Sequence, residues 1–440
     1  MKRLYLITAL LTCYMVAYPQ QIYDLKQCIE TGLDYNYSIR IVRNEEQISR
    51  NNAIPGNAGY LPTLDLNGGF SGSLYNYNTD YADGTSDKVN NNNSETANIG
   101  VNMNWTIFDG FGIQANYARL KELEQMGELN TRLSIEDLIA NITGVYYSLI
   151  RQTIRLNNLQ SAVNLSKERL RIVEERYRIG VTSLLELNQA KAYFNADSSS
   201  LISQLETVYA TSVSLGTLMA LEPDHLIMVS DSSIIFNTML NKDELWQNIL
   251  SNNISLLISQ KNKTLSEIDY KRVVSRNYPY VRLNGGYGYT SNWYSVGNSD
   301  MQQRLGLNYG ITVGITLFDG LNRRREQRNA QIQIKNSDLR LQNVELAIKD
   351  DFAKLWMAYQ NNLEIWILEK ENLIVAHETY STAMERYRLG ELSGIELREA
   401  QNTLLGAEER RSIAEYNTKL CEISLFQLSG QIMSYLYPEN

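Results

Sequence analysis

The chain has 440 residues, which is enough for two or three ordinary domains. Its net charge is -8, with 41 Lys and Arg against 49 Asp and Glu, so it lacks the basic surplus that a nucleic-acid partner requires. Hydrophobic residues make up 43% of the sequence, and no run of 18 apolar residues follows the N-terminal segment, so no transmembrane helix is predicted. An outer-membrane barrel is not excluded, because only half of the residues in its strands are apolar.

Residues 1–21 are predicted to be a secretory signal peptide. Two basic residues precede a mostly apolar stretch, and cleavage is expected near its end. Cys13 offers lipidation as an alternative, although the residues before it match that motif poorly. The mature chain then keeps Cys28 and Cys421, which permit one disulfide but fit better as buried small hydrophobic residues.

The first half of the mature chain combines helical and strand patterns. Helical spacing covers 24–52, and proline and glycine then break it. Residues 61–108 predict an antiparallel hairpin, in which 75–95 form a long polar loop without periodicity. The returning strand alternates apolar residues with Asn, Gly and Thr over 97–107, and a period of two gives a strand one apolar and one polar face.

Two long helices without proline follow this hairpin. They are expected over 113–178 and 183–221, with a turn near Gly180. At ~1.5 Å per residue, a helix of roughly 65 residues is on the order of 100 Å long. No compact globular core needs a helix of that length.

The second half repeats every element, so we interpret the chain as an internal duplication of 22–240 and 241–440. It contains one helical segment over 243–276, a hairpin over 279–318 whose last strand alternates over 305–317, and two long helices joined near Gly390. The same tripeptide closes both hairpins: Phe108, Asp109 and Gly110, then Phe318, Asp319 and Gly320.

The strands predict an assembly of several chains. Each half contributes two strands, and four strands cannot close a membrane barrel, because even the smallest single-chain barrels use about eight. In a membrane the open edges of a sheet must be paired. Other chains must therefore complete the sheet.

The turns between the long helices share one pattern. An arginine lies in the last turn of the first helix, a glycine closes that helix, and a Ser-x-x-Glu capping box starts the next. The residues are Arg178, Gly180, Ser183 and Glu186 in the first half, and Arg388, Gly390, Ser393 and Glu396 in the second. On these signals alone, a structural role in a tight helical hairpin is favoured.

Nothing in the sequence predicts catalysis, a cofactor or a metal site. His225 and His377 lie far apart and fit packing or surface roles. The glycine-rich stretch 283–288 lies inside an alternating strand and not in a phosphate-binding loop. The arginine run 323–325 has two interpretations that stay open: a solvated helix start, or contact with lipid headgroups beside a barrel rim.

In this order, the elements resemble the TolC family of outer-membrane efflux proteins. The resemblance covers nearly all of 24–429. It rests on a helix, a strand entry with proline, a hairpin, Phe-Asp-Gly, a long helix, an Arg-Tyr-x-x-Gly turn and a second long helix, all present twice. The turns at 176–180 and 386–390 are close to the family's form. Each motif alone is weak, whereas the ordered pair of repeats is specific.

The resemblance implies a mixed α and membrane-β fold. Three protomers would each give four strands to one 12-stranded β-barrel, and a long α-helical tunnel would continue it through the periplasm. It implies the outer-membrane exit duct of a tripartite efflux or type I secretion system, which conducts small molecules or peptides passively and is not an enzyme. The implied partners are two further copies of the chain, a periplasmic adaptor protein, an inner-membrane transporter and outer-membrane lipid, with no cofactor.

The resemblance also implies the roles of single residues. It places the acids of the pore constriction at Glu396 and Glu399, and the acid and tyrosine of the closing network at Glu186 and Tyr387. Three copies of the two constriction acids on an axis would favour cations. The network's arginine falls at Leu392, which puts that ion pair in doubt. Adaptor contacts are expected at Gly180, Val181, Thr182, Gly390, Leu392 and Ser393, and the two Phe-Asp-Gly segments are expected to join barrel and tunnel.

Two other classes of protein are compatible with part of the pattern. A porin would explain the polar strand faces but not the long helices, because porins join their strands by short periplasmic turns. A structural coiled-coil protein would explain the helices, but it would not need four alternating strands.

Overall fold

The structure is a computed structural model that describes residues 22–223, 226–296 and 299–435. The predicted signal peptide and His225 lie outside these residues. The elements of the first half are β1 (Ile22–Tyr23), α2 (Leu25–Tyr35), α3 (Tyr37–Asn52), α4 (Pro55–Ala58), β2 (Thr63–Asp80), β3 (Ser86–Phe108), α5 (Gly112–Arg178) and α6 (Leu184–Leu218). Those that follow are β4 (Met228–Val229), α7 (Lys242–Asn252), α8 (Ile254–Ser275), β5 (Tyr280–Tyr294), β6 (Met301–Gly314), α9 (Asn322–Leu389), α10 (Gly394–Leu428) and the 3-10 helix η2 (Ile432–Tyr435).

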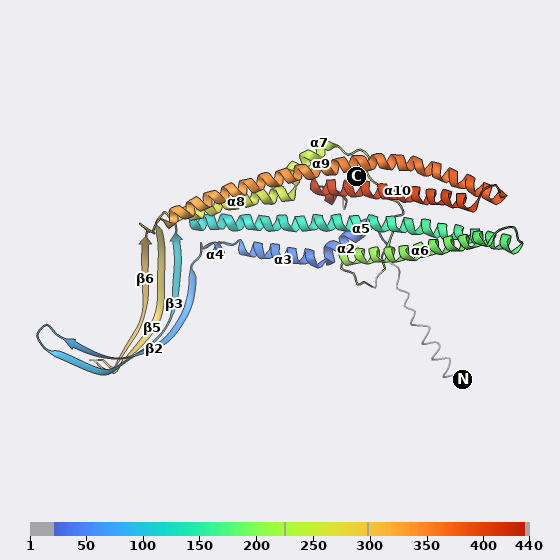
Figure 1. Cartoon of the computed structure of the whole chain (residues 1–440). Helices are drawn as coiled ribbons and strands as arrows, with labels where there is room; N and C mark the ends of the chain where they lie inside the picture. Colours follow the sequence, from blue (N-terminus) through green and yellow to red (C-terminus); the bar gives the residue numbers. More distant parts are fainter. Residues whose placement is uncertain (1–21, 224–225, 297–298, 436–440) are drawn as a thin grey trace, which may run out of the picture. The chain divides into compact units, whose positions relative to one another are not determined.

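The long helices predicted from the sequence are present. α5 and α9 contain 67 and 68 residues, and α6 and α10 contain 35 each. Figure 1 shows α6 running back beside α5, and α10 beside α9. Within the part of the chain that the structure describes, every helix lacks the long apolar stretch that crossing a membrane would take.

The prediction of one unbroken helix at the start of each half is wrong. Asn36 separates α2 from α3, and Asn253 separates α7 from α8. Each asparagine donates from its side-chain amide to the carbonyl oxygen at the end of a long helix, Asn36 to Leu218 and Asn253 to Leu428, both over 2.9 Å. Each side-chain oxygen accepts a backbone N–H of the next helix and caps it. The helical spacing continues across the break, so periodicity alone could not detect it.

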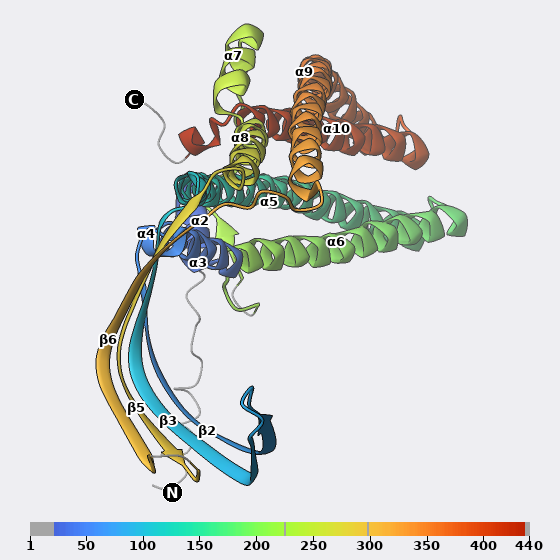
Figure 2. The ribbon, with the colours of Figure 1, turned by 90° about the vertical axis from the view of Figure 1, so that its left-hand side faces the viewer.

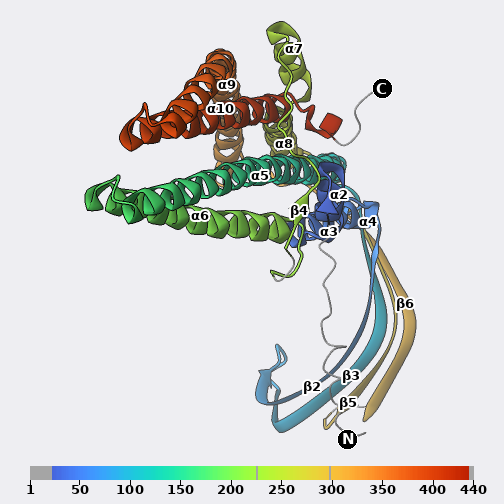
Figure 3. The ribbon, with the colours of Figure 1, turned by 90° about the vertical axis from the view of Figure 1, so that its right-hand side faces the viewer.

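The four long strands form one antiparallel sheet in the order β2-β3-β5-β6. Figures 2 and 3 show these strands side by side in a single curved sheet. Within the described residues, the outer edges of β2 and β6 pair with no further strand. Backbone N–H and C=O groups along both edges therefore stay available for another chain.

The loop predicted over 75–95 is instead mostly strand. β2 and β3 stay paired as far as Asp80 and Ser86, beyond a register shift between Tyr75 and Tyr77. Opposite that shift Asn91 has a φ of 54°, and its backbone N–H donates to the side-chain oxygen of Asn76. Strand pairing uses backbone groups, so a polar stretch without alternation still pairs when its partner strand is adjacent.

The last strand is shorter than its alternation suggested. β6 ends at Gly314, opposite Tyr280, which is the first residue of β5. Residues 315–317 continue the apolar alternation, but they have no partner strand to pair with. The alternating sequence thus outlasts the sheet by three residues.

The contacts divide the described chain into two compact units. One contains 22–44, 130–257 and 344–435, and the other contains 45–129 and 258–343. The main hydrophobic core lies in the first unit, where fully buried residues of α2, α5 and α6 meet: Ile29, Ile139, Ile142, Tyr146 and Leu215. Cys28 also lies in this core, as predicted, and both described cysteines are free thiols.

Candidate functional site

The turn between α5 and α6 is closed by the predicted glycine. Gly180 has a φ of +76°, and the N–H of Val181 donates to the carbonyl of Arg176 over 2.9 Å, as expected for a left-handed helix end. The Ser183 hydroxyl accepts the N–H of Glu186 over 3.2 Å. The Glu186 carboxylate accepts the hydroxyl of Thr182. Glu186 therefore helps to close this turn within one protomer.

The turn between α9 and α10 contains a complete capping box. The Glu396 N–H donates to the Ser393 hydroxyl over 3.3 Å, and the Glu396 carboxylate accepts the Ser393 N–H over 3.0 Å. The Ser393 hydroxyl also donates to this carboxylate and lowers the pKa of Glu396. Gly390 has a φ of +81° and closes α9. Glu399 lies one turn further along α10, and its exposed carboxylate forms no ion pair with another described residue.

Both turns expose apolar side chains. The most exposed are Ile179 and Val181 in the first turn, at 69% and 70%, and Leu389 in the second, at 74%. Leu392, the position of the family's arginine, is half-buried. Exposed apolar side chains beside polar caps are typical of a surface that another protein covers.

Tyr387 lies inside the protomer and not on its surface. Its side chain is 1% exposed, and the Arg176 guanidinium lies 5.4 Å from its ring centroid. Its hydroxyl has no hydrogen-bond partner among the described residues. Tyr387 thus connects the last turn of α9 with the last turn of α5.

A buried ion pair between α6 and α10 was missed by sequence reasoning. Arg398 Nη1 and Nη2 lie 2.6 and 2.7 Å from the two carboxylate oxygens of Asp197. The Asp197 and Arg398 side chains are only 8% and 14% exposed. The Ser166 hydroxyl of α5 donates to the same carboxylate. Bidentate geometry and burial make this a strong polar link between the two helix pairs.

Tyr193 extends this link. The guanidinium groups of Arg169 and Arg398 each lie 5.1 Å from the centroid of its ring. A methyl group on Gly394 would lie 2.7 Å from Arg169 Nη2, so the glycine leaves room for the arginine. In the sequence, the one weak signal of this close packing is Gly394, a glycine at the first position of α10. Nothing in it paired residues that lie 201 positions apart.

Both Phe-Asp-Gly segments make the same strand-to-helix turn. Asp109 Oδ1 accepts the N–H of Ile113 over 2.9 Å, and Asp319 Oδ2 accepts the N–H of Arg323 over 3.0 Å. Two consecutive residues with positive φ follow each aspartate: Gly110 and Phe111, then Gly320 and Leu321. The first segment starts at the last residue of β3, whereas the second starts four residues after the end of β6 at Gly314. Their role as the junction of barrel and tunnel stays a prediction.

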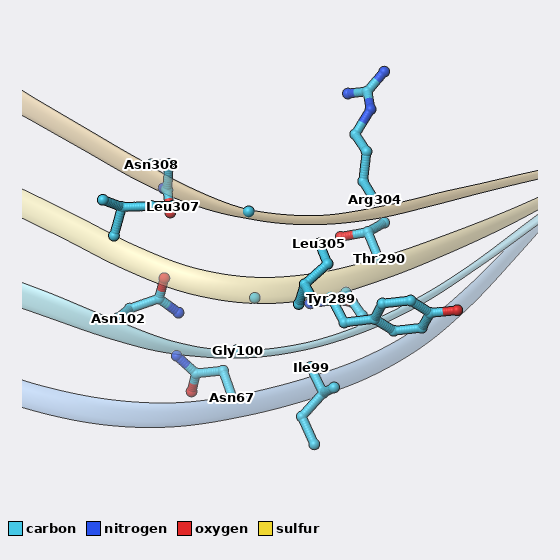
Figure 4. A pocket seen from close by; sticks show the side chains of 13 residues that line it. Asn67, Ile99, Gly100, Asn102, Tyr289, Thr290, Arg304, Leu305, Leu307 and Asn308 are labelled. Atoms are coloured by element: carbon cyan, nitrogen blue, oxygen red, sulfur yellow. The ribbon is translucent and has the colours of Figure 1, made fainter.

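The sheet has one apolar face and one that is small and polar. On the polar face, asparagines pair across the strands with glycines, as in Asn67 with Gly100 and Asn102 with Gly286. A methyl group on Gly286 would lie 2.6 Å from the side-chain oxygens of both Asn102 and Asn308. Figure 4 shows Asn67, Asn102 and Asn308 over neighbouring strands. The glycines leave room for the amides, and this face also carries the charged residues Asp65, Arg282 and Arg304.

The comparisons with known proteins agree with this arrangement. The family model described as Outer membrane efflux protein matches residues 31–220 and 245–431. The chain belongs to this family. No curated protein matches the sequence. The resemblance to TolC-family channels predicted from the sequence is confirmed.

Solved channels of the outer membrane have the same fold as this family member. The chain is 15% identical to VceC from Vibrio cholerae, with a TM-score of 0.73 over 92% of this chain and 96% of that one. It is 17% identical to CmeC of Campylobacter jejuni, with a TM-score of 0.76 over 92% of this chain and 85% of that one. It is 14% identical to the open state of MtrE of Neisseria gonorrhoeae, with a TM-score of 0.74 over 93% of this chain and 89% of that one. The predicted fold class, long helices with a β-sheet part as in these channel structures, is confirmed, and the protein is an outer membrane efflux protein.

Proposed function

We propose that this channel is the exit duct of a tripartite efflux or type I secretion system, and that it works as a homotrimer. The observation that carries the proposal is the four-stranded sheet, which has one apolar face, one mostly polar face and two edges unpaired within the described residues. Three copies would bring 12 strands into one barrel, and each β2 edge would pair with a β6 edge of the next copy. Cargo would then pass along the polar face while lipid contacts the apolar one.

We further propose that the turns between the long helices form the gate. Glu186, Glu396 and Glu399 would bring carboxylates to the narrow end of the tunnel. The buried Tyr387 would hold the two turns of one protomer together, because its ring packs against Arg176. Nine carboxylates on a threefold axis would favour cations over anions.

The proposed partners are a periplasmic adaptor protein at the turns and an inner-membrane transporter that supplies the energy. The adaptor would contact Gly180, Val181, Thr182, Gly390, Leu392 and Ser393. The exposed apolar residues of both turns support this surface. Photo-crosslinkers at Thr182 and Ser393 in living cells should capture one periplasmic partner. Capture from neither position would contradict the placement.

Planar-bilayer recordings test the duct and its gate together. The purified protein should give discrete cation-selective channels, and replacing Glu396 and Glu399 by alanine should reduce the cation preference. The matched control is Glu385→Ala, an exposed acid of α9 that lies outside the proposed gate. Deleting the protein should also sensitise cells to toxic compounds or block the secretion of a peptide. Normal export in the deletion strain would refute the duct, and unchanged selectivity would refute the gate.

A further inference from the structure

The start of α9 concentrates positive charge in a protein whose net charge is -8. Between 322 and 340 the sequence has six cations and only two acids, Glu326 and Asp338. The cations are Arg323, Arg324, Arg325, Arg328, Lys335 and Arg340. An exposed local excess of this kind is balanced by solvent counterions, by acids from a neighbouring segment or by an anionic partner.

The two acids of this segment are already neutralised by other cations. Glu326 forms an ion pair with Arg276, just beyond the end of α8. Asp338 lies 2.6 Å from the ammonium group of Lys263 on α8, and this pairing lowers the pKa of Asp338. Little negative charge therefore remains for the exposed arginines of α9.

The arginines of the run do not share one role. Arg323 is held in the fold, because it donates to the Asp319 carboxylate over 3.2 Å and to the carbonyls of Leu317 and Arg276 over 3.3 Å. Arg324 and Arg328 are exposed, and neither forms an ion pair with another described residue. Arg325 is also exposed, with Glu326 at 3.8 Å.

The exposed cations are close in the sequence to exposed apolar residues. Arg324 and Arg328 are four positions apart, so they share one face of α9. β6 ends at Gly314, ten residues before Arg324, and in the segment between them the side chains of Leu317, Phe318 and Leu321 are 87%, 75% and 57% exposed. Arginines next to large apolar side chains match the border between the headgroups and the hydrocarbon of a membrane.

The duplication shows that the turn itself does not need these arginines. The residues that follow Asp109 at the same distances are Gln114, Ala115 and Ala118. Asp109 and Asp319 nevertheless cap their helices in the same way. The three arginines are thus an addition to a turn that already folds without them.

We propose that Arg324, Arg325 and Arg328 bind the phosphate groups of anionic phospholipid at the membrane surface. Guanidinium groups match phosphate oxygens in charge and geometry. Leu317, Phe318 and Leu321 would lie in the adjacent acyl region. The proposal rests on the proposed placement of the sheet in the membrane, and it adds a lipid class and the residues that select it.

The test uses the residues of the first half as replacements. The variant R324Q/R325A/R328A is reconstituted beside the unaltered protein into phosphatidylcholine vesicles with a minor fraction of phosphatidylglycerol. The lipid retained by each is counted by native mass spectrometry. The control R40Q/R43Q/K349Q removes three exposed cations elsewhere. One basic residue near an anionic surface contributes on the order of a fivefold change, so the variant should lose at least tenfold of its preference for phosphatidylglycerol.

Three results would overturn the proposal. The first is an unchanged lipid preference in the variant, and the second is an equal loss in the control. The third is a variant trimer that falls apart equally with and without phosphatidylglycerol, because the arginines would then belong to contacts between chains. Conductance in pure phosphatidylcholine separates this test from that of the duct. A protein that conducts but shows no lipid preference refutes only the lipid site.

Discussion

Breaking the ion pair between Asp197 and Arg398 should loosen the link between the two helix pairs. Removing one partner of a buried pair costs about 3–5 kcal/mol, because the other charge stays buried without compensation. Both side chains are less than one-sixth exposed, so solvent screens the pair weakly. Arg398 would keep its stacking on Tyr193, and Asp197 would keep the Ser166 hydroxyl. We therefore expect the low end of the range, about 3 kcal/mol for Asp197→Ala or Arg398→Ala.

Thermal unfolding followed by the helical circular dichroism signal measures this effect. In a folded unit of this size 1 kcal/mol corresponds to about 2 °C, so each single variant should melt about 6 °C lower at a fixed scan rate. The double variant removes both charges and should melt no lower than the worse single variant. The control is Arg171→Ala, which breaks an exposed ion pair: the Arg171 side chain is 67% exposed and that of its partner Glu168 is 54% exposed. It should shift the midpoint by about 1 °C or less.

Two outcomes would refute this reasoning. Additive losses in the double variant would mean that the charges act independently and that the pair is not the link. Single variants that melt like the unaltered protein would mean that water reaches the site and compensates the remaining charge.

Three further predictions concern single residues. Because Ser393 lowers the pKa of Glu396, the Glu396 carboxylate should stay ionised at more acidic pH than an ordinary glutamate. As the pH falls, the Ser393→Ala channel should therefore lose its cation preference at a higher pH than the unaltered channel. Identical pH profiles in bilayer recordings would contradict this. Burial raises the pKa of the Cys28 thiol to about 12, so maleimide should leave this thiol unmodified at pH 8 until the protein unfolds. Rapid labelling of Cys28 in the folded protein, detected by mass spectrometry, would disprove the burial. Asn253→Ala removes the cap of α8 and the hydrogen bond to the Leu428 carbonyl. The melting midpoint should fall by roughly 2–4 °C, which corresponds to a loss of about 1–2 kcal/mol of stability. An unchanged midpoint would exclude the capping role.

The parts of the fold that could be predicted are those written in local, repeated patterns. Alternation identified the two faces of the strands, and glycine with Ser-x-x-Glu identified both helical turns. The duplication strengthened each signal, because the same order of elements occurring twice is improbable by chance. The open edges of the sheet and its polar face were predicted from these patterns without any contact information.

The parts that could not be predicted depend on contacts between distant residues. Asn36 breaks a helical pattern only because the end of α6 is near enough to accept its amide hydrogen bond. The extension of β2 and β3 past Tyr75 depends on hydrogen bonds between backbone groups, and these do not require an alternating pattern of side chains that the sequence would reveal. Asp197 and Arg398 resemble ordinary surface charges in the sequence, and their burial arises only when α6 and α10 pack together.

The free edges of the sheet should close between copies of the chain. One cysteine replaces Asn67 in β2 and another replaces Asn308 in β6, both on the polar face, in a background without Cys28 and Cys421. A long flexible bismaleimide is then added to the membrane-embedded protein, and the products are separated by size under denaturing conditions. A closed ring of three predicts covalent dimers and trimers and nothing larger, with each single-cysteine chain giving no trimer. Monomers alone, or a ladder that continues beyond the trimer, would contradict the account.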